Sequence, residues 1–167
     1  MLANQKIFLR EVILTDVPIL LDWENDVENW EVSSTTAPFS TEEIVFFAAS
    51  NQHIYTHGQM RFMICFEGNH KPIGCIDLFE YDAKLKKAGV GILIGEKELR
   101  NKGFATQALN LLLHLSFNQF NLVTIFAEID KNNSSSICLF EKCNFKFVKD
   151  NFRNEKIMRY YEIKCNK

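Results

Sequence analysis

The sequence predicts an α/β (α+β) fold in which a mixed central sheet has helices on both sides. Two apolar segments flank Gly68-Asn69, a dipeptide typical of the tight turn between two antiparallel strands. A strand, a helix and another strand follow one another over residues 88–129, which indicates a parallel crossover. Further segments carry apolar residues at helical spacing behind helix-start signals, which predicts covering helices.

Composition indicates one compact domain. The chain has 167 residues, of which 47% are hydrophobic, so it can build a substantial core. Its net charge of −2 provides no overall basic field for nucleic acid, and no apolar run approaches membrane-spanning length. The five cysteines form no Cys-x-x-Cys pair, as in reduced proteins. We therefore expect a single cytoplasmic domain over residues 1–167, with no nucleic-acid or membrane partner.

The N-terminal part predicts a strand and a helix. Residues 6–12 are expected to form the strand, and residues 14–30 one continuous helix. Thr15 or Asp16 can cap this helix, and Pro18 falls in its first turn, where a missing N–H costs little. The helix has an apolar face, formed by Leu20, Trp23, Val27 and Trp30, and an acidic face, formed by Glu24, Glu28 and Glu31.

The middle of the chain predicts a second helix and three strands. Ser40 and Glu43 stand at the spacing of a capping box, which predicts a helix over residues 40–50. The two hairpin strands lie within residues 60–82. Residues 88–95 predict a third strand, which lacks polar alternation and is therefore expected to be buried on both faces.

The C-terminal part alternates helices and strands. A long helix from residue 103 to about residue 120 is apolar except for a polar stripe, so most of it should be buried. A short helix over residues 133–143 has Asn133 or Ser134 as its cap. The remaining predicted elements are strands over residues 122–129, 145–148 and 155–163.

Two cations precede a glycine in the stretch LRNKGFATQAL, residues 99–109, at the start of the long helix. The first N–H groups of a helix lack internal partners and carry the positive end of its dipole. Gly103 lets the backbone approach a ligand, and Arg100 and Lys102 can add charge-assisted hydrogen bonds. The stretch predicts a phosphate site, while a turn glycine beside two solvated cations explains the same residues equally well.

Neighbouring segments extend this pattern. Arg100, Gly103 and Ala105 follow the order Arg-x-x-Gly-x-Ala at a strand-to-helix junction, after the segments PIGCIDLF and AGVGILIG. With these features the chain resembles the GCN5-related N-acetyltransferases, the GNAT family, and its LREVILTDVPILLDWEND segment resembles the branch that acetylates ribosomal-protein N-termini and polyamines. A second family motif, Asn-x-x-Ser-x-x-x-Tyr-x-x-x-Gly-Phe, corresponds to Asn133, Ser136, Phe140, Asn144 and Phe145.

The resemblance implies a mostly antiparallel sheet with one splayed parallel strand pair. It implies that acetyl-coenzyme A is the cosubstrate and that the pyrophosphate lies on residues 100–105. The strand before this loop would pair through its backbone with the pantetheine arm, in a slot between Ile92–Ile94 and Ala127–Ile129. The cofactor-binding residues that it implies are Ile92, Leu93, Ile94, Arg100, Asn101, Lys102, Gly103, Phe104, Ala105, Asn133, Ser136 and Phe140. No metal is expected, because His53 and His57 stand at a spacing that could bind one but have no third ligand nearby.

Phe140 stands where the family has a tyrosine that protonates the departing thiolate, and phenylalanine cannot donate a proton. A thiol has a reference pKa of about 8.5, so its thiolate is a tolerable leaving group near neutral pH. Water, Tyr160, Tyr161 or Cys138 are the alternative proton donors, and the sequence does not choose among them.

Gly89 stands where many relatives have a glutamate that helps to deprotonate the amine. An amine acceptor arrives mostly as ammonium, so another group must take its proton before attack. Asp77 and Glu80, on the preceding strand, are the nearest plausible carboxylates. Solvated groups at a strand end are the alternative interpretation of both residues.

The acceptor is expected to be a primary amine on a protein N-terminus, a polyamine or another small molecule, attacked directly in a ternary complex. The acidic residues Glu24, Glu28 and Glu31, with Trp30, are candidates for binding a cationic acceptor, and a solvated helix face is the alternative. Other hypotheses are a catalytically weak or inactive coenzyme A-binding regulatory protein and an interaction domain without a coenzyme site. A homodimer is also compatible with the family.

Overall fold

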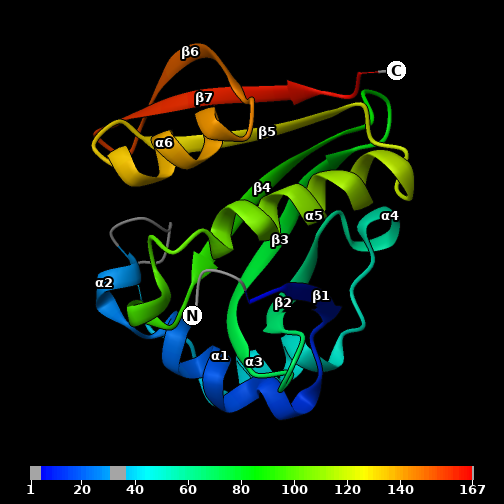
Figure 1. Ribbon diagram of the computed structural model, residues 1–167, viewed down its shortest axis with the longest axis vertical. Coiled ribbons are helices and arrows are strands. Elements are labelled where there is room, and N and C mark those ends of the chain that lie inside the picture. The colour runs from blue at the N-terminus through cyan, green and yellow to red at the C-terminus, as the bar shows by residue number, and fades with distance from the viewer. Residues whose placement is uncertain (1–4, 31–36, 167) are drawn as a thin grey trace.

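The computed structural model describes residues 5–30 and 37–166. Seven strands form one sheet in the order β1-β2-β3-β4-β5-β7-β6 (Figure 1). Neighbouring strands are antiparallel except β4 and β5, which run parallel. The predicted mixed sheet with a parallel crossover is thus confirmed. The strands are β1 (Ile7–Glu11), β2 (Met60–Phe66), β3 (Pro72–Asp82), β4 (Lys87–Ile94), β5 (Thr124–Asp130), β6 (Lys146–Arg153) and β7 (Lys156–Lys164).

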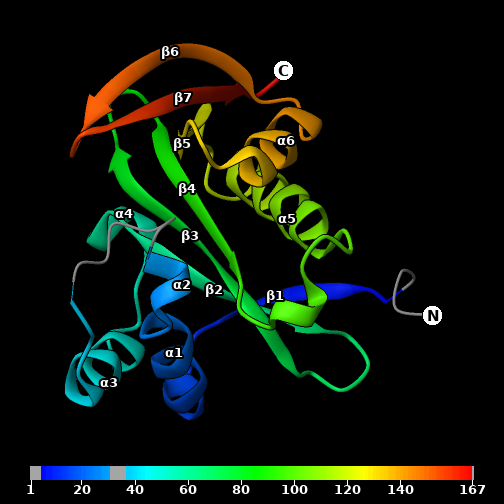
Figure 2. The same ribbon diagram turned by 90° about the vertical axis from the view of Figure 1, so that its left-hand side faces the viewer.

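Helices cover both faces of the sheet, as Figure 2 shows. On β2, Met63 packs with α1 and α3 residues, whereas its neighbours Phe62 and Ile64 belong to the larger core that includes α5. Because side chains alternate along a strand, these two clusters lie on opposite faces. The α-helices are α1 (Val17–Glu24), α2 (Val27–Trp30), α3 (Thr41–Ala49), α4 (Ile54–His57), α5 (Phe104–Asn118) and α6 (Ser134–Lys142), with 3₁₀ turns η2 (Leu14–Asp16) and η3 (Lys97–Leu99).

The single helix predicted over residues 14–30 is wrong. After η2 and α1, the chain breaks at Asn25, whose side chain exchanges two hydrogen bonds with the backbone of Phe39, at 2.8 and 3.0 Å. Asp26 then accepts the Glu28 N–H at 3.1 Å. Such side chains compete with helical backbone bonds, so a short separate helix, α2, follows. Consequently Val27 is 64% exposed, whereas Asn29 is buried.

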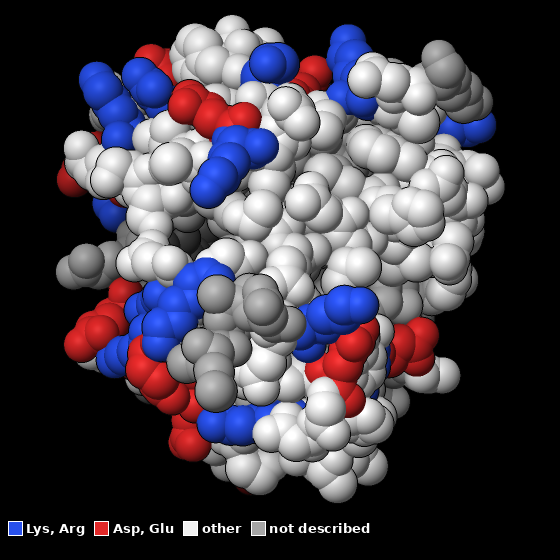
Figure 3. Space-filling view, viewed as in Figure 1, with Lys and Arg blue, Asp and Glu red and all other residues white. Residues whose placement is uncertain are grey.

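Other local signals agree with the structure. The capping box of α3 forms, with Glu43 N–H donating to Ser40 Oγ and Ser40 N–H to Glu43 Oε2. Helix α5 contains no charged residue, and the surface over it shows hardly any charge (Figure 3). A one-turn helix, α4, was not predicted, and β6 extends beyond the predicted residue 148 to Arg153.

Within the part of the chain that the structure describes, no helix combines the length and apolar character needed to cross a bilayer. Over the same residues, no three His, Cys, Asp or Glu side chains gather in a group that could hold a metal ion.

Candidate active site

Strands β4 and β5 pair over a short stretch that ends at Gly89 opposite Phe126. Beyond it, β4 continues in the ladder with β3 and β5 continues in the ladder with β7. The two strands diverge from this point (Figure 1). Ile92–Ile94 and Ala127–Ile129, between which the family resemblance implies a slot, therefore lie beyond the paired stretch.

Among the described residues, two large cavities adjoin the divergence. The loop cavity, of about 450 Å³, is lined mainly by the end of β4, the loop before α5 and the starts of α5 and α6. The sheet cavity, of about 390 Å³, is lined mainly by α1, β3, β4 and β5. Asn29, Ile92 and Leu93 line both cavities, so the cavities meet where β4 has left β5.

The start of α5 presents backbone donors to the loop cavity. The first intrahelical bond joins the Gln107 N–H to the Gly103 C=O, so the N–H groups of residues 104–106 precede it. Gly103 has φ of 87°, and a Cβ on it would meet nothing within 4 Å. Open space therefore lies in front of this backbone. Together with the positive end of the helix dipole, this geometry suits an anion.

Arg100 lines the loop cavity but uses its guanidinium within the protein. Its Nε donates to the Ile94 C=O at 2.9 Å, and its Nη2 donates to Asn29 Oδ1 at 3.0 Å. The side chain therefore joins the end of β4 to α2.

The other predicted loop residues differ in what they offer a ligand. Asn101 and Ala105 line the loop cavity. Lys102 is exposed and lines neither cavity. The Phe104 ring is buried against Phe66, with ring centroids 5.2 Å apart. Phe104 can therefore offer a ligand only its backbone N–H, and not its side chain.

Helix α6 contributes a cap and a buried ring. Asn133 and Ser136 line the loop cavity, and the Asn133 side-chain oxygen accepts the Ser136 N–H at 3.1 Å. Phe140 is only 3% exposed and meets Phe145 edge-on, with ring centroids 4.9 Å apart. Phe140 lines neither cavity, so its ring packs the core. Lys142, which the sequence interpretation did not include, adds a cation to the loop cavity.

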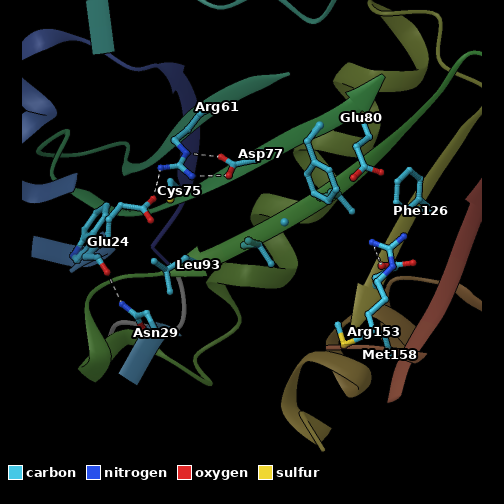
Figure 4. A pocket seen from close by; sticks show the side chains of 16 residues that line it. Glu24, Asn29, Arg61, Cys75, Asp77, Glu80, Leu93, Phe126, Arg153 and Met158 are labelled. Atoms are coloured by element: carbon cyan, nitrogen blue, oxygen red, sulfur yellow. Dashed lines mark hydrogen bonds and ion pairs between the residues drawn. The ribbon is translucent and has the colours of Figure 1, made fainter. Parts of the chain in front are cut away.

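The sheet cavity is acidic, because four carboxylates and two guanidinium groups line it, a formal balance of −2. Its walls also include the aromatic rings of Trp23, Phe79 and Phe126. Figure 4 shows two clusters of charged side chains: Glu24, Arg61 and Asp77 at the α1 end, and Glu80 and Arg153 beside Phe126. The charged lining residues are Glu24, Arg61, Asp77, Glu80, Glu128 and Arg153.

Arg61 holds two of these carboxylates. Its Nε and Nη2 each donate to Asp77, both at 2.7 Å, and its Nη1 donates to Glu24 (Figure 4). Burial by itself would lower the pKa of Arg61, but the charges of Asp77 and Glu24 outweigh it and raise that pKa well above its usual value. Burial also raises the pKa of the adjacent Cys75 thiol to about 12, which makes Cys75 a poor nucleophile.

The other two carboxylates differ in their partners. Glu128 accepts a hydrogen bond from Asn151 at 2.9 Å and pairs with Arg153 at 3.2 Å. Glu80 is exposed, and its side chain makes no hydrogen bond or ion pair with the described residues. It occupies an irregularity of β3 with φ of 49° and extends toward Phe126 (Figure 4). Glu80 is thus the cavity carboxylate most available to a ligand.

Gly89 leaves no room for a side chain. A Cβ there would lie 2.5 Å from the Phe79 ring and 2.8 Å from the Phe126 ring. These rings meet edge-on, with centroids 5.9 Å apart. The space that a glutamate would enter from this position is therefore filled by two phenylalanines.

Of the alternative proton donors, only Cys138 lines a described cavity, the loop cavity. The Tyr160 hydroxyl donates to Glu162 at 3.0 Å, and its ring stacks on Phe126, outside both cavities. Burial raises the pKa of Tyr160. The buried Tyr161 donates to Glu141 at 2.9 Å.

The predicted acceptor residues separate in the structure. Glu24 lines the sheet cavity, whereas Glu28 lines the loop cavity and pairs with Lys97 at 2.8 Å. Trp30 lines neither cavity and donates its Nε1–H to the Glu24 C=O at 2.7 Å. Glu31 lies outside the described residues.

The chain matches the model of the acetyltransferase (GNAT) domain over residues 6–146. It is 30% identical over 118 residues to a spermidine N(1)-acetyltransferase of Vibrio cholerae, a match that covers 68% of this chain and 65% of that protein. An uncharacterized N-acetyltransferase p20 of Bacillus licheniformis is 25% identical over 162 residues, covering 96% of this chain and 86% of its own length.

Solved structures share the fold. The spermidine N-acetyltransferase of Vibrio cholerae in complex with coenzyme A and spermine superposes with a TM-score of 0.84 at 23% identity, covering 95% of each chain. The fold, the divergent strand pair and the family match agree with the resemblance found in the sequence. The chain therefore belongs to the acetyltransferase (GNAT) domain family.

Proposed function

We propose that the chain transfers an acetyl group from acetyl-coenzyme A to a primary amine of a polyamine. The observation that carries this proposal is the meeting of two cavities at Asn29, Ile92 and Leu93, one suited to an anion and the other acidic. Direct attack of the amine, without an acylated cysteine, fits the raised pKa of the Cys75 thiol in the sheet cavity.

The loop cavity is proposed to bind acetyl-coenzyme A, whose thioester supplies the activated acetyl group. The N–H groups of residues 104–106 would hold the diphosphate, with Lys142 nearby. The edge of β4 beyond Gly89, which no longer pairs with β5, would receive the pantetheine arm. Family membership supports this assignment, and the open space at Gly103 supports the fit.

The sheet cavity is proposed to bind the acceptor. Its formal balance of −2 favours a cation, and its aromatic walls can contact ammonium groups and methylene chains. Its two clusters of charged side chains, at opposite ends in Figure 4, suit a molecule with more than one ammonium. The relatives that act on spermidine support a polyamine over a protein N-terminus.

Glu80 is proposed to take the proton from the bound ammonium. Asp77, the other candidate, has both oxygens bonded to Arg61 and would instead help to orient the acceptor. The departing thiolate would leave without a tyrosine, because its reference pKa of about 8.5 makes it a tolerable leaving group.

An amine panel tests the substrate class. Thiol release from acetyl-coenzyme A is measured with spermidine, spermine, an aminoglycoside and an alanyl peptide. We expect kcat/KM to be highest for the two polyamines. Tight coenzyme binding with no thiol release for any amine would instead favour the regulatory hypothesis, and the peptide as best acceptor would overturn the polyamine assignment.

Substitution of Gly103 tests the coenzyme site. Gly103→Glu adds a negative charge where the diphosphate is proposed to lie, so we expect coenzyme A affinity to fall at least about tenfold, measured by calorimetry. Gly58→Glu is the matched control, because Gly58 also has a positive φ, 69°, and open space around its Cβ position. Equal affinities in the two variants would refute the loop assignment.

Self-association of this chain stays a prediction. The spermidine N-acetyltransferase of Vibrio cholerae has been solved as a dodecamer, which supports an oligomer without specifying the predicted homodimer.

A further inference from the structure

Helix α2 needs outside support to keep its position. It contains only four residues, too few for stable helical structure on its own. Its Val27 is 64% exposed, so little apolar packing holds that residue in place. Asn29, by contrast, is only 5% exposed. The position of α2 therefore depends on side-chain hydrogen bonds, and Asn29 is the most buried residue that can make them.

Asn29 connects three parts of the molecule. Its Nδ2 donates to the Trp23 C=O at 2.9 Å, and its Oδ1 accepts from Arg100 at 3.0 Å. Arg100 in turn donates to the Ile94 C=O, at the last residue of β4. A chain of hydrogen bonds thus runs from α1 through α2 to the end of the central strand.

This chain of bonds lies at the boundary between the cavities. Three residues line both cavities, and Asn29 is the one that does not belong to β4. Displacement of α2 would therefore alter the wall of the sheet cavity directly. On the loop side, the backbone donors of residues 104–106 do not depend on Asn29.

We propose that Asn29 and Arg100 form a positioning pair that fixes α2 as the shared wall of the two cavities. The pair sets the affinity for the amine acceptor, and Arg100 acts as a strut between β4 and α2 instead of as the main diphosphate ligand. The identity of the two ligands rests on the proposed function.

A second connection provides a matched control. Lys97 pairs with Asp26 and Glu28, both at 2.8 Å, and so also links α2 and the residue before it to the loop that precedes α5. The Lys97 side chain is 47% exposed, and exposed ion pairs of this kind contribute little. Lys97→Ala is therefore expected to change the amine KM by less than about twofold.

The test compares Asn29→Ala, Arg100→Ala and the double variant. Loss of a buried hydrogen bond to a charged group predicts an amine KM raised at least about tenfold in each single variant. The coenzyme A dissociation constant and kcat should stay within about threefold. Because both changes remove the bond between Asn29 and Arg100, the KM effect in the double variant should be smaller than the sum of the two single effects.

Tryptophan fluorescence gives a readout that is independent of activity. The chain has two tryptophans, Trp23 in α1 and Trp30 in α2, and they lie on either side of Asn29 in the sequence. Acrylamide quenching should rise in Asn29→Ala and remain at the wild-type level in Lys97→Ala. Asn29→Asp keeps the acceptor for Arg100 and should give an intermediate KM, which covers the case in which Asn29→Ala does not fold.

Two results would overturn the proposed role of Asn29 and Arg100. One is unchanged amine KM and unchanged quenching in Asn29→Ala. The other is a coenzyme affinity that falls more than about tenfold in Arg100→Ala alone, which would make Arg100 a phosphate ligand. If the wild-type chain acetylates no amine, the proposed function fails, and the quenching and coenzyme measurements still decide the pair.

Discussion

Glu80→Gln is expected to lower kcat for a polyamine about 10²–10⁴-fold near neutral pH, because it removes the proposed proton acceptor. The substitution keeps the size of the side chain. The sheet cavity retains three of its four carboxylates, so we expect the amine KM to change much less than kcat. Steady-state thiol release with varied amine separates the two constants.

The pH dependence sharpens this prediction. Without a proton acceptor the variant must use the neutral amine, whose fraction rises about tenfold per pH unit below the amine pKa. The activity of the variant should therefore approach that of the wild type as pH rises from 6.5 to about 9.5. Glu67→Gln is the control, because Glu67 is exposed and lines neither cavity. A constant ratio of the two activities across this range would argue against Glu80 as the base.

Arg61→Met is expected to reduce the free energy of unfolding by about 3–5 kcal/mol, because it leaves the carboxylates of Asp77 and Glu24 without their shared cation. Their side chains are only 28% and 17% exposed. Urea denaturation followed by circular dichroism measures the change. Adding Asp77→Asn and Glu24→Gln to Arg61→Met should recover part of the loss, because no unpaired charge then remains.

Arg153→Met is the matched control for Arg61→Met. Arg153 lines the same cavity and also pairs with a carboxylate, that of Glu128. Its side chain, however, is 61% exposed, so its pair should contribute less than about 1 kcal/mol. Similar losses of stability in the two variants would show that Arg61 does not have the special role assigned to it.

Features set by nearby residues could be predicted from the sequence. The cap of α3 at Ser40, the cap of α6 at Asn133 and the left-handed Asn144, with φ of 67°, all follow from local hydrogen bonding and backbone preference. The break between α1 and α2 could not, because apolar spacing continues across it. The bonds from Asn25 to Phe39, fourteen residues away, decide that break.

The site was predicted only in part, because several of its contacts join residues that are far apart in the chain. Arg61 stands opposite Asp77 only because the register of β2 and β3 shifts between Ile64 and Cys65, so the hairpin turn alone does not predict their pair. The pair of Glu128 with Arg153 could not be predicted from the sequence. Glu128 is on β5 and Arg153 is on β6, and β7, which follows β6 in the chain, lies between these two strands in the sheet. Asn29 joins the site only through the unpredicted α2.

The irregularity in β3 has a consequence for how position 80 can vary. A φ of 49° suits glycine or asparagine, and a glutamate there carries about 1–2 kcal/mol of conformational penalty. Selection for thermal robustness alone would therefore replace this residue. In the proposed mechanism the same residue supplies the base, so chemistry opposes folding here and stabilised versions of the enzyme should be sought at other positions.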